Sequence, residues 1–306
     1  LRLALTGSVR ATDRLSVLAE LRSENLAQIQ PFALYARVRP WPSRRFDVQL
    51  GRIPPTFGAF TRRAYGHDNP LIGYPLAYQY LTSLRPDAAA ASADELVRMR
   101  GRGWLSNFTL GNTEPGRGLP LVTVFSWDTG IQVGTGWRGV DVAASVTNGS
   151  ASNPRVDDDN NGKQVAGRVT VRPAAGLVVG GSIAHADFLT GTLAAELATA
   201  EASGFTQRAY GLDLEYSRSH WLVRSDTVLS EWTVPVVGTP AIANPLRALA
   251  VSVEGRYTFL PGFYAAARVE HLGFNKVTTS TEVTTWDAPV ARVEVGGGYY
   301  LQRNLI

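Results

Sequence analysis

Residues 249–259 read LAVSVEGRYTF, and this short segment decides the fold class. Its odd positions, from Leu249 to Phe259, are apolar or aromatic apart from one glycine, whereas the positions between them are small or charged, as at Glu254. Successive side chains of a β-strand point to opposite faces, so the segment predicts a strand with one apolar and one polar face. The same alternation recurs at 210–216, 263–270 and 291–299.

Period-two patterning of this kind extends along nearly the whole chain of 306 residues. It predicts strands at 2–10, 15–24, 31–39, 46–53, 131–137, 139–148, 163–172, 177–187, 208–218, 221–232, 247–259, 263–274 and 289–301. We expect a fourteenth strand to begin where the sequence stops.

The connections between these strands alternate in length. Short turns fall at 11–14, 40–45, 137–139, 173–176, 218–220, 260–262 and 302–304. Long polar loops fall at 25–30, 54–130, 149–162, 188–207, 233–246 and 275–288. Short turns on one side and long loops on the other are typical of a transmembrane antiparallel β-barrel of the bacterial outer membrane. A soluble β-sandwich is the alternative, but its loops need not sort by side.

Strand direction adds an expectation about size. A barrel of this class usually has an even number of strands and both termini on the periplasmic side. We therefore expect one strand beyond each end, about 16 in all, which is enough to leave an aqueous lumen. The sequence opens in a strand without Met or a signal peptide. We therefore expect residues 1–306 to be one barrel domain trimmed at both ends.

Tryptophan and tyrosine cluster where strands end, as in the aromatic girdles of membrane barrels. The aromatic residues near short turns are Trp41, Trp137, Trp221 and Tyr299. Those near long loops are Trp127, Trp232 and Trp286. We therefore predict two girdles.

Composition excludes several classes of protein. Cysteine is absent, which excludes a disulfide scaffold and a thiolate metal site, and a hydrophobic content of 44% excludes a disordered chain. No apolar run approaches the ~20 residues of a membrane-spanning helix. The chain has 28 arginines, two lysines, 26 acidic residues and a net charge of +4. The arginines are dispersed singly along strands and form no patch for nucleic acid.

Residues 46–60 read FDVQLGRIPPTFGAF. The core of this segment, VQLGRIPPTFG, resembles the strand-end motif of phosphate-selective porins of the O and P type. The resemblance implies a 16-stranded, often trimeric porin whose lumen binds anions through basic side chains, with Arg52 as a basic group of the upper lumen. That family's phosphate site is rich in lysine, whereas this chain has only Lys163 and Lys276. The alternative is that Pro54 and Pro55 simply end a strand, because proline cannot donate to the ladder.

Charged side chains on the polar strand faces are the strongest functional signal. With apolar positions facing lipid, the inward set includes Glu20, Arg22, Arg37, Arg39, Arg168, Arg172, Arg224, Asp226, Glu254, Arg256, Arg268, Glu270, Arg292 and Glu294. Opposite charges two residues apart would form belts around the lumen, whose field holds water and orients dipolar solutes. The alternative is that they pair with one another, as in any wet interior.

Residues 54–130 are too many for a structureless connection. Ser92 and Glu95 form a capping box followed by apolar residues, and Gly101 is a stop signal, so we predict a short helix at about 93–100. We favour a constriction loop in which Arg98, Arg100 and Arg102 meet permeating anions. An extracellular cap is the alternative.

Metal and catalytic sites find little support. Residues 157–162, DDDNNG, offer calcium-type oxygens but lack EF-hand spacing, so a hairpin tip is favoured. The histidines are scattered without ligand or catalytic spacing: His67, His185, His220 and His271. No nucleotide, zinc or catalytic motif appears, so we expect no cofactor and no enzyme activity.

The function we predict is passive diffusion of small hydrophilic solutes through an outer-membrane porin, with a weak preference for anions. The expected partners are the lipid bilayer, the solutes and, by resemblance, two further copies in a trimer. A structural or interaction barrel, which sheathes or supports a partner protein without acting as a channel, is the alternative.

Overall fold

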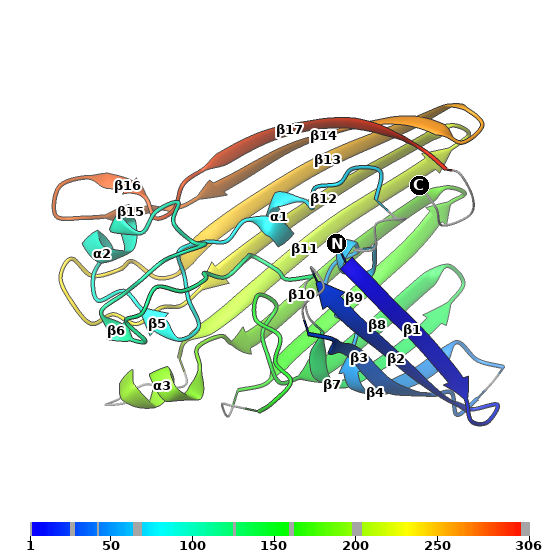
Figure 1. Ribbon diagram of the computed structural model, residues 1–306, viewed down its shortest axis with the longest axis horizontal. Coiled ribbons are helices and arrows are strands. Elements are labelled where there is room, and N and C mark those ends of the chain that lie inside the picture. The colour runs from blue at the N-terminus through cyan, green and yellow to red at the C-terminus, as the bar shows by residue number, and fades with distance from the viewer. Residues whose placement is uncertain are drawn as a thin grey trace.

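The computed structural model describes residues 2–24, 28–41, 43–63, 69–124, 127–158, 162–197 and 204–300. Thirteen strands form one antiparallel sheet in which every strand pairs with its neighbours in chain order (Figure 1). They are β1 (Arg2–Arg10), β2 (Leu15–Glu24), β3 (Gln30–Val38), β4 (Phe46–Ile53), β7 (Asp128–Trp137), β8 (Val140–Thr147), β9 (Gln164–Ala174), β10 (Leu177–Asp187), β11 (Thr206–Arg218), β12 (Trp221–Trp232), β13 (Leu246–Leu260), β14 (Phe263–Phe274) and β17 (Val290–Tyr299).

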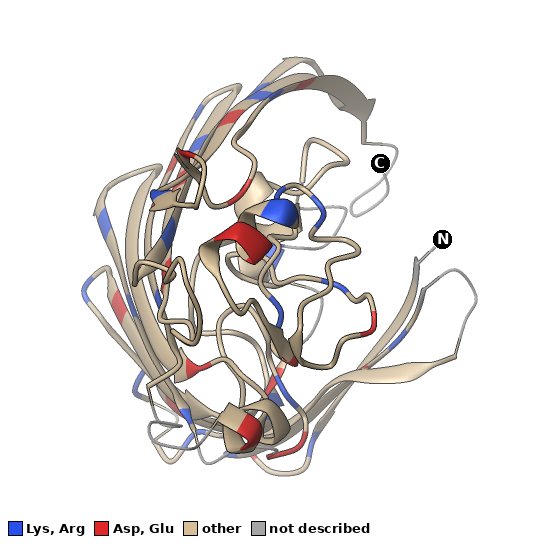
Figure 2. Cartoon of the chain, turned by 90° about the vertical axis from the view of Figure 1, so that its left-hand side faces the viewer, with Lys and Arg blue, Asp and Glu red and all other residues tan. Residues whose placement is uncertain are grey.

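This sheet curls into an antiparallel barrel. Viewed from the end that carries the long loops, the strands surround an interior occupied by loop segments (Figure 2). Strands β1 and β17 are the two edges, and within the described residues they do not pair with each other. All thirteen predicted strands are confirmed, with ends that agree to within three residues. The predicted fourteenth strand lies outside the described residues.

The predicted assignment of the two strand faces is confirmed. Val253 pairs with Val269, which in turn pairs with Val293, and these side chains are 49%, 58% and 69% exposed on the outside of the barrel. Their neighbours Glu254 and Arg268 point inward and are buried. Since a one-residue slip would turn every side chain to the other face, this contrast fixes the register.

The aromatic prediction is only half right. Trp41, Trp137 and Trp221 are exposed at the short-turn end, as a girdle requires. In contrast, Trp232 and Trp286 are completely buried and pack edge to face with ring centroids 5.9 Å apart. They were expected in the second girdle, and that expectation was wrong.

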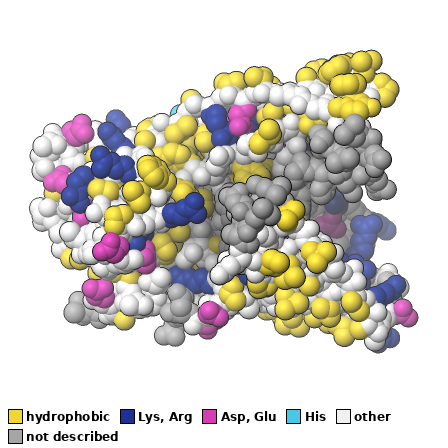
Figure 3. Space-filling model, viewed as in Figure 1, with side chains coloured by type: hydrophobic (Ala, Val, Ile, Leu, Met, Phe, Trp, Pro, Cys, Tyr) yellow, Lys and Arg dark blue, Asp and Glu magenta, His cyan; other side chains and the backbone are white. Residues whose placement is uncertain are grey.

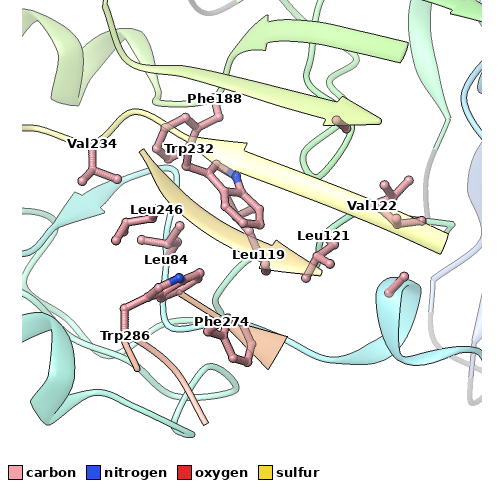
Figure 4. Close-up of a cluster of buried hydrophobic side chains, with 14 of the residues drawn as sticks. Leu84, Leu119, Leu121, Val122, Phe188, Trp232, Val234, Leu246, Phe274 and Trp286 are labelled. Atoms are coloured by element: carbon pink, nitrogen blue, oxygen red, sulfur yellow. The ribbon is translucent and has the colours of Figure 1, made fainter. Parts of the chain in front are cut away.

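The reason is the strand register. Trp232 lies an even number of residues from the inward-facing Leu222 and Val228 of β12, so it too points into the barrel. There the two tryptophans join an apolar core with Phe188, Leu119 and Leu121, drawn from β10–β14 and from the long loop (Figure 4). The interior near the loop end of these strands is therefore packed like a protein core.

The smaller elements lie in the connections. They are η1 (Phe60–Arg63), α1 (Leu76–Gln79), β5 (Ala88–Ala89), α2 (Ala93–Arg98), β6 (Leu110–Gly111), α3 (Gly191–Leu197), β15 (Lys276–Thr278) and β16 (Val283–Thr285). Helix α2 confirms the predicted helix at 93–100. The Ser92 hydroxyl accepts from the Glu95 amide at 3.3 Å, and the Glu95 carboxylate accepts from the Ala91 amide at 2.7 Å. No helix in the described ranges is both long and apolar enough to cross a membrane.

The outward register of β13 predicts the effect of a charge there. We expect Val253→Arg to lower the free energy of unfolding by roughly 2–4 kcal/mol, the cost of a basic side chain near the bilayer midplane. Leu260→Arg, at the turn end of the same strand, should cost only about 0–1 kcal/mol because that end lies near the interface. Urea unfolding in lipid vesicles measures both, and equal losses would contradict the register.

Candidate functional site

The described parts of the first stretch of the long loop, residues 54–63 and 69–80, run along the inner wall of the barrel. The Thr56 hydroxyl bonds to Gln132 on β7 at 2.9 Å and to Ser145 on β8 at 2.8 Å. The Gly58 amide donates to the Ser182 hydroxyl on β10 at 3.0 Å. The loop therefore follows the wall from β7 towards the C-terminal strands.

The same segment then reaches β12 and β14. The Tyr78 hydroxyl donates to the Asp226 carboxylate at 2.7 Å, and the Leu76 amide donates to the Glu270 carboxylate at 2.9 Å. Buried backbone amides need such acceptors. The polar faces of the strands thus supply hydrogen-bond acceptors to the loop. In a water-filled pore these acceptors would bind water instead.

Beneath this segment, the inward charges of β12–β17 form one ion-pair network. Its centre is Arg268, which is 1% exposed and lies 3.2 Å from Glu254 and 3.4 Å from Glu270, and which also pairs with Glu294. Arg292 lies 2.6 Å from Glu270. A buried guanidinium is tolerated only when such partners compensate for its lost hydration.

The network continues to β11 and ends on the loop. Arg224 lies 2.8 Å from Glu215 and 3.5 Å from Glu254, and Arg63 of η1 lies 3.1 Å from Glu215. The network then holds four arginines and four glutamates: Arg63, Arg224, Arg268, Arg292, Glu215, Glu254, Glu270 and Glu294. It is therefore electrically neutral.

Two arginines of the network also bind the backbone of the loop. Arg268 donates to the carbonyl oxygen of Gly73, and Arg292 donates to that of Tyr74. A Cβ at position 73 would lie 2.1 Å from a Glu294 carboxylate oxygen, so a larger residue there would force the Glu294 side chain to move. The charges predicted to form a lumen belt therefore pair with one another and hold residues 73–76 against the wall.

The remaining predicted site residues lie apart from this network. Arg256 donates to the Tyr300 hydroxyl at 2.8 Å. Arg52 pairs in register opposite Leu34, whose side chain points outward, and its guanidinium donates to the carbonyl oxygens of Trp127 and Pro31. The structure thus does not bring Arg52 together with the interior charges.

Arg98, Arg100 and Arg102 lie on and after α2, beyond the strand ends (Figure 1). Arg98 pairs with Glu95 at 3.2 Å, and Arg100 donates to the Thr284 hydroxyl of β16 at 2.6 Å. All three are exposed. Helix α2 lies over the mouth of the barrel, while residues 54–63 and 69–80 lie inside it (Figure 2). That the loop narrows a conducting path stays a prediction.

Asp287 ties the loop to the mouth. It is fully buried, and its carboxylate accepts from the Ser83 amide at 2.7 Å, the Gly101 amide at 2.8 Å and the Tyr80 hydroxyl at 3.0 Å. Burial raises the pKa of this carboxyl above its ordinary value, although the donors oppose that shift. Contacts at both ends therefore fix the loop in place.

The opposite wall, β3–β9, borders a cavity of about 610 Å³. Five arginines and two aspartates line it: Arg37, Arg39, Arg44, Arg45, Arg168, Asp47 and Asp141. Aromatic and amide side chains complete the lining, among them Tyr35, Phe46, Gln49, Trp127 and Gln132. Unlike the network wall, this wall has a clear excess of positive charge.

Sequence reasoning placed Arg37, Arg39 and Arg168 on the inner face but missed Arg44 and Arg45. The alternation that reveals inward residues exists only within strands, and these two lie in the turn between β3 and β4. The available signal was the pair of adjacent arginines in a short turn whose flanking strands carry inward arginines.

Metal binding finds no support among the residues that the structure describes. No group of three or more His, Cys, Asp or Glu in that part of the chain could hold a metal ion. His185 and His271 are exposed on separate strands, and His220 contacts the Thr258 carbonyl oxygen at 2.8 Å. His67 and residues 159–161 of the acidic hairpin lie outside the described residues.

No protein-family model and no curated protein matches this sequence. Among solved structures, the chain resembles a porin refined at 1.8 Å resolution, with 14% identity and a TM-score of 0.53 over 98% of this chain and 82% of that one. It resembles Salmonella typhi OmpF in complex with daunomycin, with 12% identity and a TM-score of 0.51 over 99% and 78%. The channel DcaP of Acinetobacter baumannii gives 10% and 0.50 over 90% and 66%. These likenesses establish the fold, a porin-like β-barrel.

The network predicts a large effect of removing its central charge. We expect Arg268→Met to lower the free energy of unfolding by about 3–5 kcal/mol, because it leaves buried carboxylates without compensation. Arg256→Met removes a comparable side chain that lies outside the network and should cost less, about 1.5–3 kcal/mol at most. Urea unfolding in lipid vesicles, followed by tryptophan fluorescence, compares the two. Equal losses would show that Arg268 has no central role.

Proposed function

We propose that this protein is an outer-membrane porin through which small hydrophilic solutes diffuse passively. Support comes from the barrel itself, with apolar side chains outside and polar side chains inside, and from its likeness to solved porins. The apolar outer face would contact lipid or, in a trimer, neighbouring copies. We infer from the same likeness that the protein lies in the bacterial outer membrane.

The observation that carries the proposal is the contrast between the two inner walls. Beyond its first contacts with β7, β8 and β10, the loop packs against β11–β17, where neutral ion pairs and apolar residues hold it. Along β3–β9 the interior keeps a cavity of about 610 Å³ lined by charged and amide side chains. Solutes would pass along this second wall, where water meets polar side chains.

A weak preference for anions follows from the charges. The ion-pair network on the loop-covered wall adds no net charge, whereas the cavity wall has more arginines than aspartates. Arginine remains charged at any physiological pH. Phosphate selectivity has less support, because neither lysine lines this cavity: Lys163 pairs with Asp158 at 2.7 Å, and Lys276 lies in β15.

The alternative, a barrel that sheathes a partner protein, requires a wide and empty lumen. Residues 54–63 and 69–80 and the apolar core around Trp232 occupy a large part of the interior. A partner segment could not enter without displacing them. The filled interior therefore favours a channel for small solutes over a sheath.

A planar-bilayer recording tests the proposal. We expect ohmic single-channel currents, and in Thr170→Cys a charged thiol reagent should reduce them because Thr170 lines the cavity. Val169→Cys is the matched control, since its side chain lies next in the strand but faces outward. The native chain has no cysteine, so each reaction is confined to one site.

Absence of any conductance from the folded protein would refute the porin function. A current reduced by modification at 169 but not at 170 would instead mean that the path does not follow this wall.

A further inference from the structure

The cavity on the open wall runs along most of β7, and its two ends differ in character. At the short-turn end lie Arg39, Arg44 and Arg45, and Figure 3 shows basic side chains gathered at that end of the molecule, on its right. At the loop end the lining contains Tyr35 and Trp127 instead. A preference for anions does not explain this aromatic end.

The two aromatic rings at the loop end are held in place. The Trp127 ring centroid lies 6.3 Å from that of Tyr35 and 5.1 Å from that of the buried Phe32. The Arg52 guanidinium donates to the Trp127 carbonyl oxygen at 3.1 Å, so the backbone of this tryptophan is fixed as well as its ring. Tyr35 and Trp127 are only partly buried. Together they offer a solute a fixed aromatic surface.

A row of polar side chains lies next to this surface. In the strand register Arg37 is opposite Gln49, which is opposite Gln132, and all three line the cavity. Tyr35 precedes Arg37 by two residues on the same face of β3, a step of roughly 7 Å. Trp127 lies on the other side of Tyr35, towards the loop. The aromatic surface and the polar row therefore extend together over roughly 13 Å.

The charges of this row are neutralised, but not all of its hydrogen-bonding atoms are paired. Asp47 accepts from Arg37 and from Gln49, each at 2.9 Å. The Gln49 Oε1 and Arg37 Nε atoms are buried and have no hydrogen-bond partner among the described residues. Gln49 as a whole is only 7% exposed. Because buried polar atoms are nearly always paired, these two point to a partner that the chain itself does not supply.

The partner that fits is uncharged and rich in hydroxyl groups. A hydroxyl both donates and accepts, so it can donate to the Gln49 oxygen and accept from the Arg37 Nε–H group. Rotation about χ3, a torsion that is broad in glutamine, turns the Gln49 oxygen towards the cavity. An anion gains little here, because Asp47 already neutralises Arg37.

We propose that the loop end of this cavity is a binding subsite for short neutral oligosaccharides. The apolar face of one sugar ring packs on Trp127 and Tyr35. Hydroxyls of the next ring bind the row of Arg37, Gln49 and Gln132. The whole cavity, at about 610 Å³, lies within the range of sites for small organic molecules, roughly 300–1,000 Å³. The inference rests on the proposed porin function, in which the subsite lies at the long-loop end of the path.

Calorimetric titration of the purified, folded protein tests the subsite without requiring a current. Cellobiose, a disaccharide with its two rings in line, should bind saturably, and glucose should bind about tenfold more weakly because one ring covers only part of the site. Inorganic phosphate should not displace cellobiose, because the unneutralised arginines lie at the other end of the cavity. Absence of saturable cellobiose binding, or its displacement by phosphate, would overturn the subsite.

Substitution of Trp127 tests the aromatic surface. Trp127→Ala should weaken cellobiose binding roughly tenfold, and Trp127→Phe much less, because a phenyl ring keeps most of the packing surface. Trp104→Ala is the matched control, since Trp104 is 69% exposed in the long loop and does not line this cavity. Wild-type affinity in Trp127→Ala would overturn the subsite.

Gln49→Met tests the polar row and leaves the aromatic surface in place. It should weaken cellobiose binding by roughly three- to tenfold, because a hydrogen bond is lost. Gln164→Met is the matched control and should bind like wild type. Gln164 also has a buried amide oxygen without a partner among the described residues, but it lines a different and smaller cavity. Equal losses in the two variants would overturn the assignment of the sugar to this cavity.

Bilayer recordings on the same samples separate this inference from the porin function. Saturable cellobiose binding by a folded protein that conducts no current would refute the porin and support the subsite. A conducting wild-type channel that binds no cellobiose would overturn the subsite alone.

Discussion

The buried guanidinium of Arg268 is the interaction on which the interior of this barrel depends. A charge that has lost its hydration must be compensated nearby, and here Glu254, Glu270 and Glu294 do so from neighbouring strands. One of its N–H groups still reaches the carbonyl oxygen of Gly73. The loop is thus one of the groups that compensate for the buried charge of Arg268. Moving the loop away would remove this partner.

Once the loop is fixed on β11–β17, the two inner walls acquire different properties. The covered wall becomes a packed core with Trp232 and Trp286 at its centre and neutral ion pairs at its edge (Figure 4). The wall from β3 to β9 keeps its cavity and an excess of arginine. At 0.1 M salt, a charge on the open wall acts on a solute only within roughly 10 Å, because salt screens the field beyond that distance. The division of the interior therefore determines which charges a solute meets.

The sequence predicted the strands well because each strand face has a distinct environment: Val253 must meet lipid while Glu254 must not. It predicted α2 because capping is local to Ser92 and Glu95. It did not predict that Trp232 faces inward, since proximity to a strand end does not reveal which face a side chain occupies. It placed Arg224 and Arg268 on the inner face but not in one network under Gly73, because that contact joins residues almost 200 positions apart.

The central claim is that the loop covers one inner wall and leaves the other open to water. Thiol labelling of Ala143→Cys and Ser252→Cys in membranes, with a water-soluble maleimide, tests it most directly. Both side chains are small and face inward. Ala143 lines the cavity, whereas Ser252 lies buried beneath loop residues that include Phe60 and Pro75. Position 143 should react much faster than position 252. Reaction at 252 as fast as at 143 would contradict the account, because it would mean that water reaches both walls alike.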